Sequence, residues 1–278
     1  MKRFILVFSL LVSFLMGFAD AGMWLPLLLK RNEAEMQSLG FKLTAEDVYN
    51  VNHSSLKDAI VLFGGGCTAE LISKNGLLLT NHHCGYSYIQ RYSTLEKNYL
   101  HNGFWAKNNN EEIPCEGLTV SFLIKMEEVT QSVLEGTEEH TSIEERKNII
   151  NENIKKVTAK FTEGTTYTAE VEAMYYGNQY FIFLYQVYSD VRLVGTPPES
   201  IGKFGGDTDN WVWPRHTGDF SMYRIYTDRD GLPAAYSSNN IPMNTPKFLP
   251  ISAKGVNEGD FTMVLGYPGT TMQYLISD

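Results

Sequence analysis

The chain has 278 residues, of which 43% are apolar and 20% charged. This length and composition argue against disorder and indicate one large domain or two small ones with a sizeable core. The formal net charge is −9 and no basic cluster is present, which argues against binding to a nucleic acid backbone. An acidic surface attracts amines and cationic peptides instead.

The first residues have the composition of a secretory signal peptide. Lys2 and Arg3 precede an apolar run from Phe4 to Phe18, and the small residues Ala19 and Ala21 follow it. We therefore predict a signal peptide at residues 1–21 and a mature chain that begins near Gly22, outside the cytoplasm. An uncleaved anchor is the alternative, although the run is short for a membrane span and no later segment is apolar enough for one.

Helical segments are expected next, at residues 24–40, which end on Gly40, and at residues 44–50, which begin on Thr44. Short apolar runs broken by Gly and Asn-Gly predict hairpins between residues 59 and 84, and residues 119–126 predict another strand. Strands are also expected at residues 180–195, 219–228 and 260–269.

A helix is predicted between these strands, near residues 141–161. Ser142 and Glu145 can form a capping box, and one face of the helix carries Ile143, Ile150, Ile154, Val157 and Phe161. Strands, one helix and more strands, without regular βαβ alternation, favour a mainly β fold with helical insertions: an antiparallel β-barrel and not a parallel sheet.

Three cysteines are present, Cys67, Cys84 and Cys115, in a compartment that permits disulfides. Cys67 and Cys84 enclose two short predicted strands around the turn "SKNG", and antiparallel pairing of these strands brings the two cysteines together. We predict a Cys67–Cys84 bridge. Cys115 is then either free and buried or paired with a group outside this chain.

Two adjacent histidines, His82 and His83, stand before Cys84 in "LTNHHC". Adjacent residues of a strand point to opposite faces, so the pair is poorly suited to hold one zinc ion, and no HExxH motif is present. Two inert histidines at a strand end are the second interpretation. The third is the general base of a serine protease, which lies between a nucleophile and a carboxylate that fixes its tautomer.

The stretch "GLLLTNHHC", with its cysteine bridge, resembles the histidine strand of chymotrypsin-like proteases. The resemblance implies that His83, next to the cysteine, is the catalytic histidine. It also implies an aspartate at the start of a later strand, which Asp219 in "TGDFSMYRIY" supplies. Asp207 and Asp209 are alternatives in a glycine-rich loop, where they would cap turns or meet a substrate charge.

Three longer stretches, "GGGCTAELISKNGLLLTNHHCGY", "FGGDTDNWVWPRHTGDFSMYR" and "GDFTMVLGYPGTT", together resemble the bacterial dipeptidyl-peptidase family of chymotrypsin-like serine exopeptidases. The resemblance covers nearly the whole mature chain. It implies secretion to the periplasm or cell surface, a double β-barrel with a helical cap, and release of dipeptides from oligopeptides with a free N-terminus. It implies no cofactor and no metal, and leaves a homodimer of the full-length protein open.

In that family an asparagine-tryptophan pair nine residues before the aspartate holds the substrate amine, which corresponds here to Asn210 and Trp211. An asparagine carbonyl and a bulky indole can bind an ammonium group and block longer chains. The alternative is that Trp211 and Trp213 only pack in the barrel.

The nucleophile of such an enzyme lies in a Gly-x-Ser-Gly turn, yet no Ser-Gly pair occurs in the 278 residues. We therefore expect the N-terminal part of a longer enzyme: helices and the first barrel at residues 22–246, and the opening of the second barrel at residues 247–278. The alternative is a non-catalytic secreted peptide-binding module on a protease-like barrel. Preference for a hydrophobic or an acidic residue before the scissile bond stays open.

Overall fold

The computed structural model describes residues 23–138, 140–206 and 213–269. Its first elements are short helices: η1 (Pro26–Arg31), α2 (Glu33–Ser38), α3 (Ala45–Val48) and η2 (Leu56–Ala59). The Thr44 hydroxyl accepts a hydrogen bond from the Asp47 N–H, and the Asp47 carboxylate accepts one from the Thr44 N–H. The helix predicted to begin at Thr44 is thus confirmed. These helices bury a small apolar cluster of their own, made by Leu29, Met36, Phe41, Ala45 and Val48.

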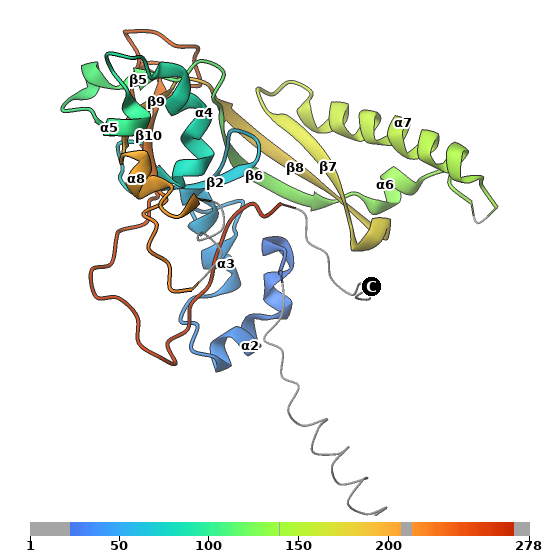
Figure 1. Cartoon of the computed structure of the whole chain (residues 1–278). Helices are drawn as coiled ribbons and strands as arrows, with labels where there is room; N and C mark the ends of the chain where they lie inside the picture. Colours follow the sequence, from blue (N-terminus) through green and yellow to red (C-terminus); the bar gives the residue numbers. More distant parts are fainter. Residues whose placement is uncertain (1–22, 139, 207–212, 270–278) are drawn as a thin grey trace, which may run out of the picture.

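One antiparallel sheet forms most of the remaining structure (Figure 1). Its longer strands are β1 (Ile60–Phe63), β2 (Cys67–Leu71), β3 (Leu77–Thr80), β6 (Val120–Glu128), β7 (Thr168–Met174), β8 (Gln179–Tyr188), β9 (Val191–Thr196) and β10 (Ser221–Thr227). They pair in the order β4-β9-β10-β3-β2-β1-β6-β8-β7, with short strands β4 (Phe104–Trp105), β5 (Ile113–Pro114) and β11 (Ile241–Pro242) at the margins. The predicted class, mainly β and antiparallel with helical insertions, is confirmed.

The sheet curves back on itself: β8 and β9 lie near opposite ends of the strand order, yet only Ser189 and Asp190 separate them along the chain. Tyr188, at the end of β8, is opposite Val120 of β6, whereas β9 starts at Val191 and pairs with β10. The strands therefore surround a core whose fully buried members include Phe63, Leu71, Leu78, Leu193, Tyr223 and Ile225. Helix α4 (His82–Tyr92) covers this core and contributes the buried Ile89.

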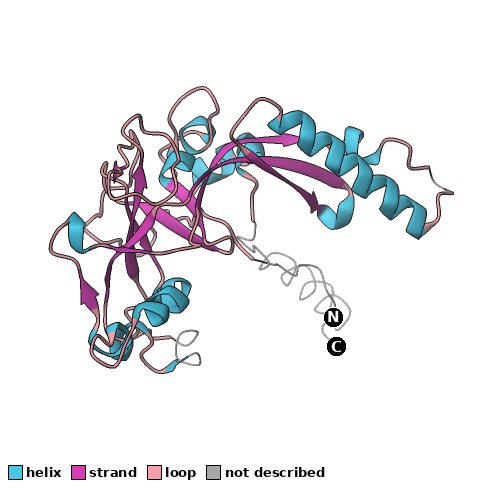
Figure 2. Ribbon diagram, turned by 90° about the horizontal axis from the view of Figure 1, so that it is seen from above, coloured by secondary structure: helices cyan, strands magenta, loops and turns pink. Residues whose placement is uncertain are grey.

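An arm projects from this body and consists of the hairpin β7–β8 together with α6 (Thr130–Leu134) and α7 (Ile143–Thr162) (Figures 1 and 2). Ser142 accepts a hydrogen bond from the Glu145 N–H, one of the two bonds of the expected capping box. The predicted helix is thus confirmed. Its expected apolar face is wrong at one position, because Ile143 is 90% exposed: it precedes the part of the helix that packs on the hairpin through Val157 and its neighbours.

The predicted strand at residues 260–269 is wrong: the described residues 247–269 contain no strand. A strand needs a neighbouring strand for its backbone hydrogen bonds. Val264 is fully exposed, and the described sheet contains none of residues 260–269. The segment nevertheless packs against the rest of the structure, because Phe261 contacts Phe41 with the two rings tilted and Tyr267 donates its backbone N–H to Thr68 Oγ1.

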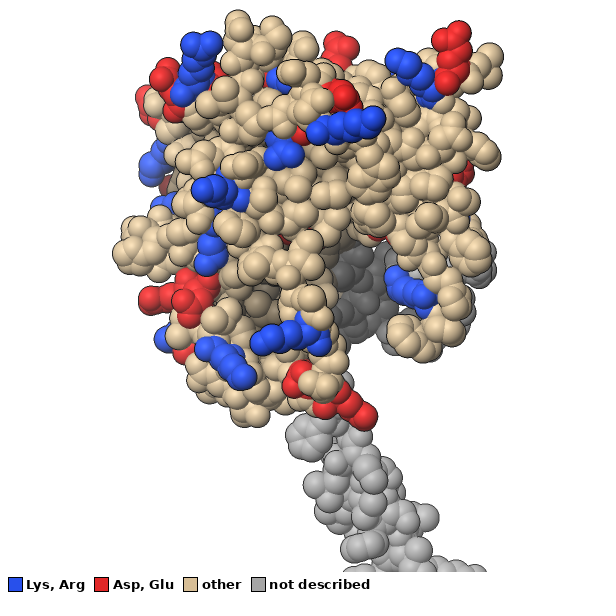
Figure 3. Space-filling view, turned by 90° about the vertical axis from the view of Figure 1, so that its left-hand side faces the viewer, with Lys and Arg blue, Asp and Glu red and all other residues tan. Residues whose placement is uncertain are grey.

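Acidic and basic side chains are interspersed on the face seen in Figure 3, so the net charge of −9 does not gather there into one acidic patch. Among the described residues, no helix is long and apolar enough to span a membrane. The predicted signal peptide, residues 1–21, lies outside the described residues. The division of the chain at residues 246 and 247 remains a prediction.

Candidate active site

The two adjacent histidines lie in a helix, not in a strand as predicted. Strand β3 ends at Thr80, Asn81 is the N-cap residue, and α4 begins at His82. The first helical turn sends the two side chains apart: His82 is completely buried, whereas the side chain of His83 is 59% exposed. The pair therefore offers one accessible imidazole.

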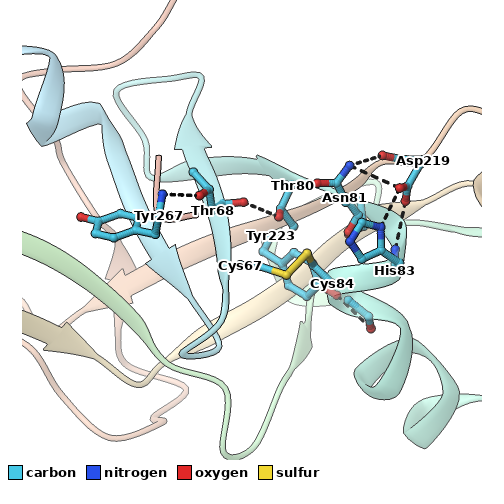
Figure 4. The surroundings of a disulfide bond; sticks show 11 residues. Cys67, Thr68, Thr80, Asn81, His83, Cys84, Asp219, Tyr223 and Tyr267 are labelled. Atoms are coloured by element: carbon cyan, nitrogen blue, oxygen red, sulfur yellow. Dashed lines mark hydrogen bonds and ion pairs between the residues drawn. A yellow bond between two sulfur atoms is a disulfide. The ribbon is translucent and has the colours of Figure 1, made fainter. Parts of the chain in front are cut away.

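A disulfide joins Cys67 and Cys84, as predicted (Figure 4). It links the first residue of β2 to the first turn of α4 across a sequence separation of 17, with the Cα atoms 6.2 Å apart. His83 lies beside both sulfur atoms, and the three side chains could suggest a metal site. Because the sulfurs are bonded to each other, they are not available as thiolate ligands.

Cys115 is a free, buried thiol within this chain, in line with the first of its two expectations; pairing with a group outside the chain stays a prediction. Burial raises its pKa to about 12, so it stays protonated and unreactive at neutral pH.

His83 and Asp219 are in direct contact. Nδ1 of the imidazole lies 2.7 Å from Asp219 Oδ2, and the backbone N–H of His83 donates to Oδ1 at 3.0 Å. The carboxylate thus lies at the N-terminus of α4, where the unpaired N–H groups and the helix dipole favour a negative charge. Its side chain is 11% exposed, so the hydrogen-bond partner of the imidazole is largely shielded from water.

Asn81 is a second contact of Asp219 that was not identified from the sequence. Its Nδ2 donates to the backbone carbonyl of Asp219 at 3.2 Å and to Oδ2 at 3.3 Å (Figure 4). The side chain of the N-cap residue is therefore turned toward the carboxylate and makes no capping bond to its own helix. Its position directly before the histidines was the only available signal.

Strand β10 holds the helix and the carboxylate together. Ser221, two residues after Asp219, donates to the carbonyl of Asn81 at 2.9 Å. Gly85 lets α4 approach the strand, because a Cβ atom built there would lie 2.1 Å from the buried Tyr223 Oη. Neither residue was singled out in the sequence, where Gly85 has no turn or periodicity to mark it.

A pocket of about 240 Å³ opens beside the imidazole. Besides His83 and Asp219, its lining consists of Tyr86, Gly202, Lys203, Gly206 and Thr217. Gly202 ends α8 (Glu199–Gly202), so the pocket lies between the start of α4, α8 and the segment that leads to Asp219.

The predicted amine-binding pair, Asn210 and Trp211, lies outside the described residues, as do Asp207 and Asp209. Trp213 is described and is 85% exposed. The alternative in which both tryptophans pack in the barrel is therefore wrong for Trp213, whose indole is outside the apolar core; for Trp211 it stays untested.

Comparison with known proteins identifies the family of this chain. The sequence model described as peptidase S46 matches residues 19–278. The chain belongs to the peptidase S46 family. It is 52% identical to the Asp/Glu-specific dipeptidyl-peptidase of Flavobacterium psychrophilum, over all of this chain and 38% of that protein. It is 51% identical to dipeptidyl-peptidase 7 of Capnocytophaga gingivalis, over 98% of this chain and 39% of that protein.

A solved structure gives the same result for the fold. The structure of Porphyromonas endodontalis DPP11 in complex with the dipeptide Arg-Glu is similar with a TM-score of 0.77 and 46% identity, covering 87% of this chain and 35% of that chain. The peptidase S46 chain described here thus spans about two fifths of the length of the curated relatives it matches, and corresponds to their N-terminal portion.

Proposed function

We propose that this chain supplies the histidine and aspartate of a serine-type dipeptidyl-peptidase, with His83 as general base and Asp219 as the residue that orients it. The observation that carries the proposal is the 2.7 Å contact between His83 Nδ1 and Asp219 Oδ2 at the edge of a pocket that both residues line. Membership of a peptidase family supports it.

The geometry suits acid–base chemistry at the other ring nitrogen. A carboxylate on Nδ1 keeps the proton on that atom, so the lone pair of Nε2 is free to take a proton from a nucleophile and to return it to the leaving amine. Asp219 then stabilises the imidazolium that forms. The second hydrogen bond, from the His83 N–H to the same carboxylate, fixes Asp219 relative to the backbone that carries the imidazole.

The nucleophile of this proposal is a serine outside the 278 residues. Support comes from the relatives, which extend well beyond the matched region. A fluorophosphonate, which labels activated serines, should modify one serine of the full-length enzyme, and peptide mass spectrometry would identify it. Labelling should be lost in His83→Ala.

The proposed substrates are oligopeptides with a free N-terminus, from which dipeptides are released. Relatives named dipeptidyl-peptidases and a DPP11 structure with a bound dipeptide support this class. The chain is similarly close to proteins named Asp/Glu-specific dipeptidyl-peptidase, at 52% identity, and dipeptidyl-peptidase 7, at 51%. We therefore leave the preference before the scissile bond open between acidic and hydrophobic residues.

We place the enzyme in the periplasm or at the cell surface. The predicted signal peptide at residues 1–21 and the Cys67–Cys84 disulfide, which needs an oxidising compartment to persist, support this location. Detection of a mature N-terminus near Gly22 in the periplasmic or surface fraction would test it; an intact Met1 in the cytoplasm would contradict it.

Steady-state kinetics of the full-length enzyme test the activity. His83→Ala and Asp219→Ala should each abolish dipeptide release, while Asn210→Ala should mainly raise KM by weakening the hold on the free amine. Blocking the amine by N-acetylation should prevent cleavage. Equal cleavage of blocked and free peptides would contradict the exopeptidase proposal.

The absence of a Ser-Gly pair favours a second candidate, a non-catalytic peptide-binding module. Dipeptide binding by the full-length protein without turnover or fluorophosphonate labelling would establish that candidate instead.

A further inference from the structure

His82 is a fully buried polar residue next to the candidate base. Both of its ring nitrogens lack a hydrogen-bond partner among the residues that the structure describes. Burial of a polar atom without a partner is unfavourable, so most such atoms in folded proteins are paired. Formation of an apolar core therefore does not by itself account for an imidazole at this position.

The His82 ring fills the space between two helices. Tyr86, on the same helix, meets it edge-on with the ring centroids 5.9 Å apart. On the side of α8, a Cβ atom built at Gly202 would lie 2.5 Å from Cγ and Cδ2 of His82 and 2.9 Å from Nε2. Carbon atoms in contact need about 3.5–4.0 Å, so only a glycine fits against this ring.

Helix α8 is also connected to Asp219. The carbonyl of Ile201 accepts a hydrogen bond from the Gly218 N–H at 3.0 Å, and Thr217 Oγ1 donates to the Phe204 carbonyl at 2.7 Å. Gly202 itself lines the pocket. A shift of α8 relative to α4 would therefore change the pocket beside His83 and strain the segment that ends at Asp219.

The charge of the His82 ring fits this position. Burial lowers its pKa from the ordinary value of 6.5; Asp219 and Glu199 act in the opposite direction, and His83 and Lys203 lower it further. The ring is thus neutral at pH 7. It adds no positive charge beside His83, which must take up a proton in the proposed reaction.

We propose that His82 is a positioning residue: its flat ring sets the distance between the first turn of α4 and α8, and with it the width of the pocket beside His83. An imidazole suits this place because it is flat, narrower than a phenyl ring and close-packed against the bare backbone of Gly202. The inference rests on the proposed function, in which the pocket receives the peptide.

A double-mutant cycle in the full-length enzyme tests this role. Gly202→Ala places a methyl group against the ring, and should raise KM for a dipeptidyl substrate roughly tenfold with a smaller change in kcat, because misplacement by about 1 Å can cost up to ~100-fold. His82→Ala removes the ring and makes room for that methyl group. In the double variant the added effect of Gly202→Ala should vanish, a signature of direct coupling.

The matched control is Gly66→Ala, because a Cβ atom at Gly66 meets nothing within 4 Å. It should leave KM unchanged. His82→Asn, with a smaller flat side chain, replaces His82→Ala in the cycle if the alanine variant does not fold.

Two results would overturn the inference: an unchanged KM in Gly202→Ala, or the same rise in KM with and without the His82 ring. Calorimetric affinity for a dipeptide product should follow the same cycle and does not depend on turnover. Failure of the proposed function would be seen separately, as normal activity in His83→Ala.

Discussion

Replacement of Asp219 by asparagine tests the site most directly, because it changes charge and hydrogen bonding with almost no change in shape. In Asp219→Asn the amide oxygen can keep the bond from the His83 N–H, which is 3.0 Å long in the native chain. The NH2 group then takes the place of Oδ2, which lies 2.7 Å from His83 Nδ1 in the native chain, and it must donate to Nδ1. Nδ1 becomes an acceptor, the ring proton moves to Nε2, and the proposed general base can no longer take up a proton there.

The expected loss is large in kcat and small in stability. A wrong histidine tautomer in a Ser-His-Asp enzyme lowers kcat by roughly 10⁴-fold, or about 5.5 kcal/mol of barrier. Loss of a negative charge at the N-terminus of α4 should cost only about 0.3–1 kcal/mol of unfolding free energy. Asn81 adds to this cost, since its Nδ2 would face another amide donor in place of Oδ2.

Two measurements on the purified full-length enzyme separate these effects: kcat on a chromogenic dipeptidyl substrate and the free energy of unfolding in denaturant. Asp230→Asn is the control, because it removes an exposed carboxylate from a loop and should change neither. A kcat for Asp219→Asn within tenfold of the native value, in a folded enzyme, would refute the assignment of Asp219 as the orienting residue.

Three further predictions concern the stability of the frame around the site. Replacing Cys67 and Cys84 together by serine should lower the free energy of unfolding by about 3 kcal/mol, the value typical for a loop of this size, as measured by denaturant unfolding against the oxidised native chain. Gly85→Ala should cost about 1–3 kcal/mol in the same assay, because the added methyl group meets the buried Tyr223 Oη; an unchanged midpoint would show that α4 can shift. Because the pKa of His82 is lowered in the folded chain, the unfolded chain takes up a proton on this ring at a higher pH than the folded chain does. The free energy of unfolding should therefore be unaffected by His82 above pH 6.5 and should fall below it, by at most about 1.4 kcal/mol per pH unit. His82→Asn should remove this part of the pH dependence.

Much of the fold follows from short-range patterns in the sequence. The apolar runs around "SKNG" specify β2 and β3, and their pairing brings Cys67 to Cys84, so the disulfide was predictable from local structure. The start of α4 was not. Its sequence, "HHCGYSYIQRY", is rich in tyrosine and contains a glycine, and it has weak helix propensity. Tertiary contacts hold this helix in place: the disulfide, the buried Ile89 and the close approach of Gly85 to β10.

The contact between the two candidate residues could be predicted from the sequence, but the residues that support this contact could not. His83 and Asp219, 136 positions apart, could be paired only through resemblance to a known family, because no local pattern relates them. The contacts of Asn81 and Ser221, and the fit of Gly202 against His82, depend on how α4, α8 and β10 pack together. Ordinary polar and small residues acquire such roles only from tertiary position.

The contact between Asp219 and His83 joins folding to the proposed chemistry, because one carboxylate both binds the imidazole and interacts with the first turn of α4. If α4 frayed, the backbone N–H that holds Oδ1 and the ring that binds Oδ2 would move together. The Cys67–Cys84 bridge opposes such fraying from the other side of the same turn. We therefore infer that substitutions at the disulfide or in the first turn of α4 lower activity in proportion to how far they loosen the start of this helix. Substitutions in the arm, which packs on a separate cluster around Val157, should leave the site geometry intact.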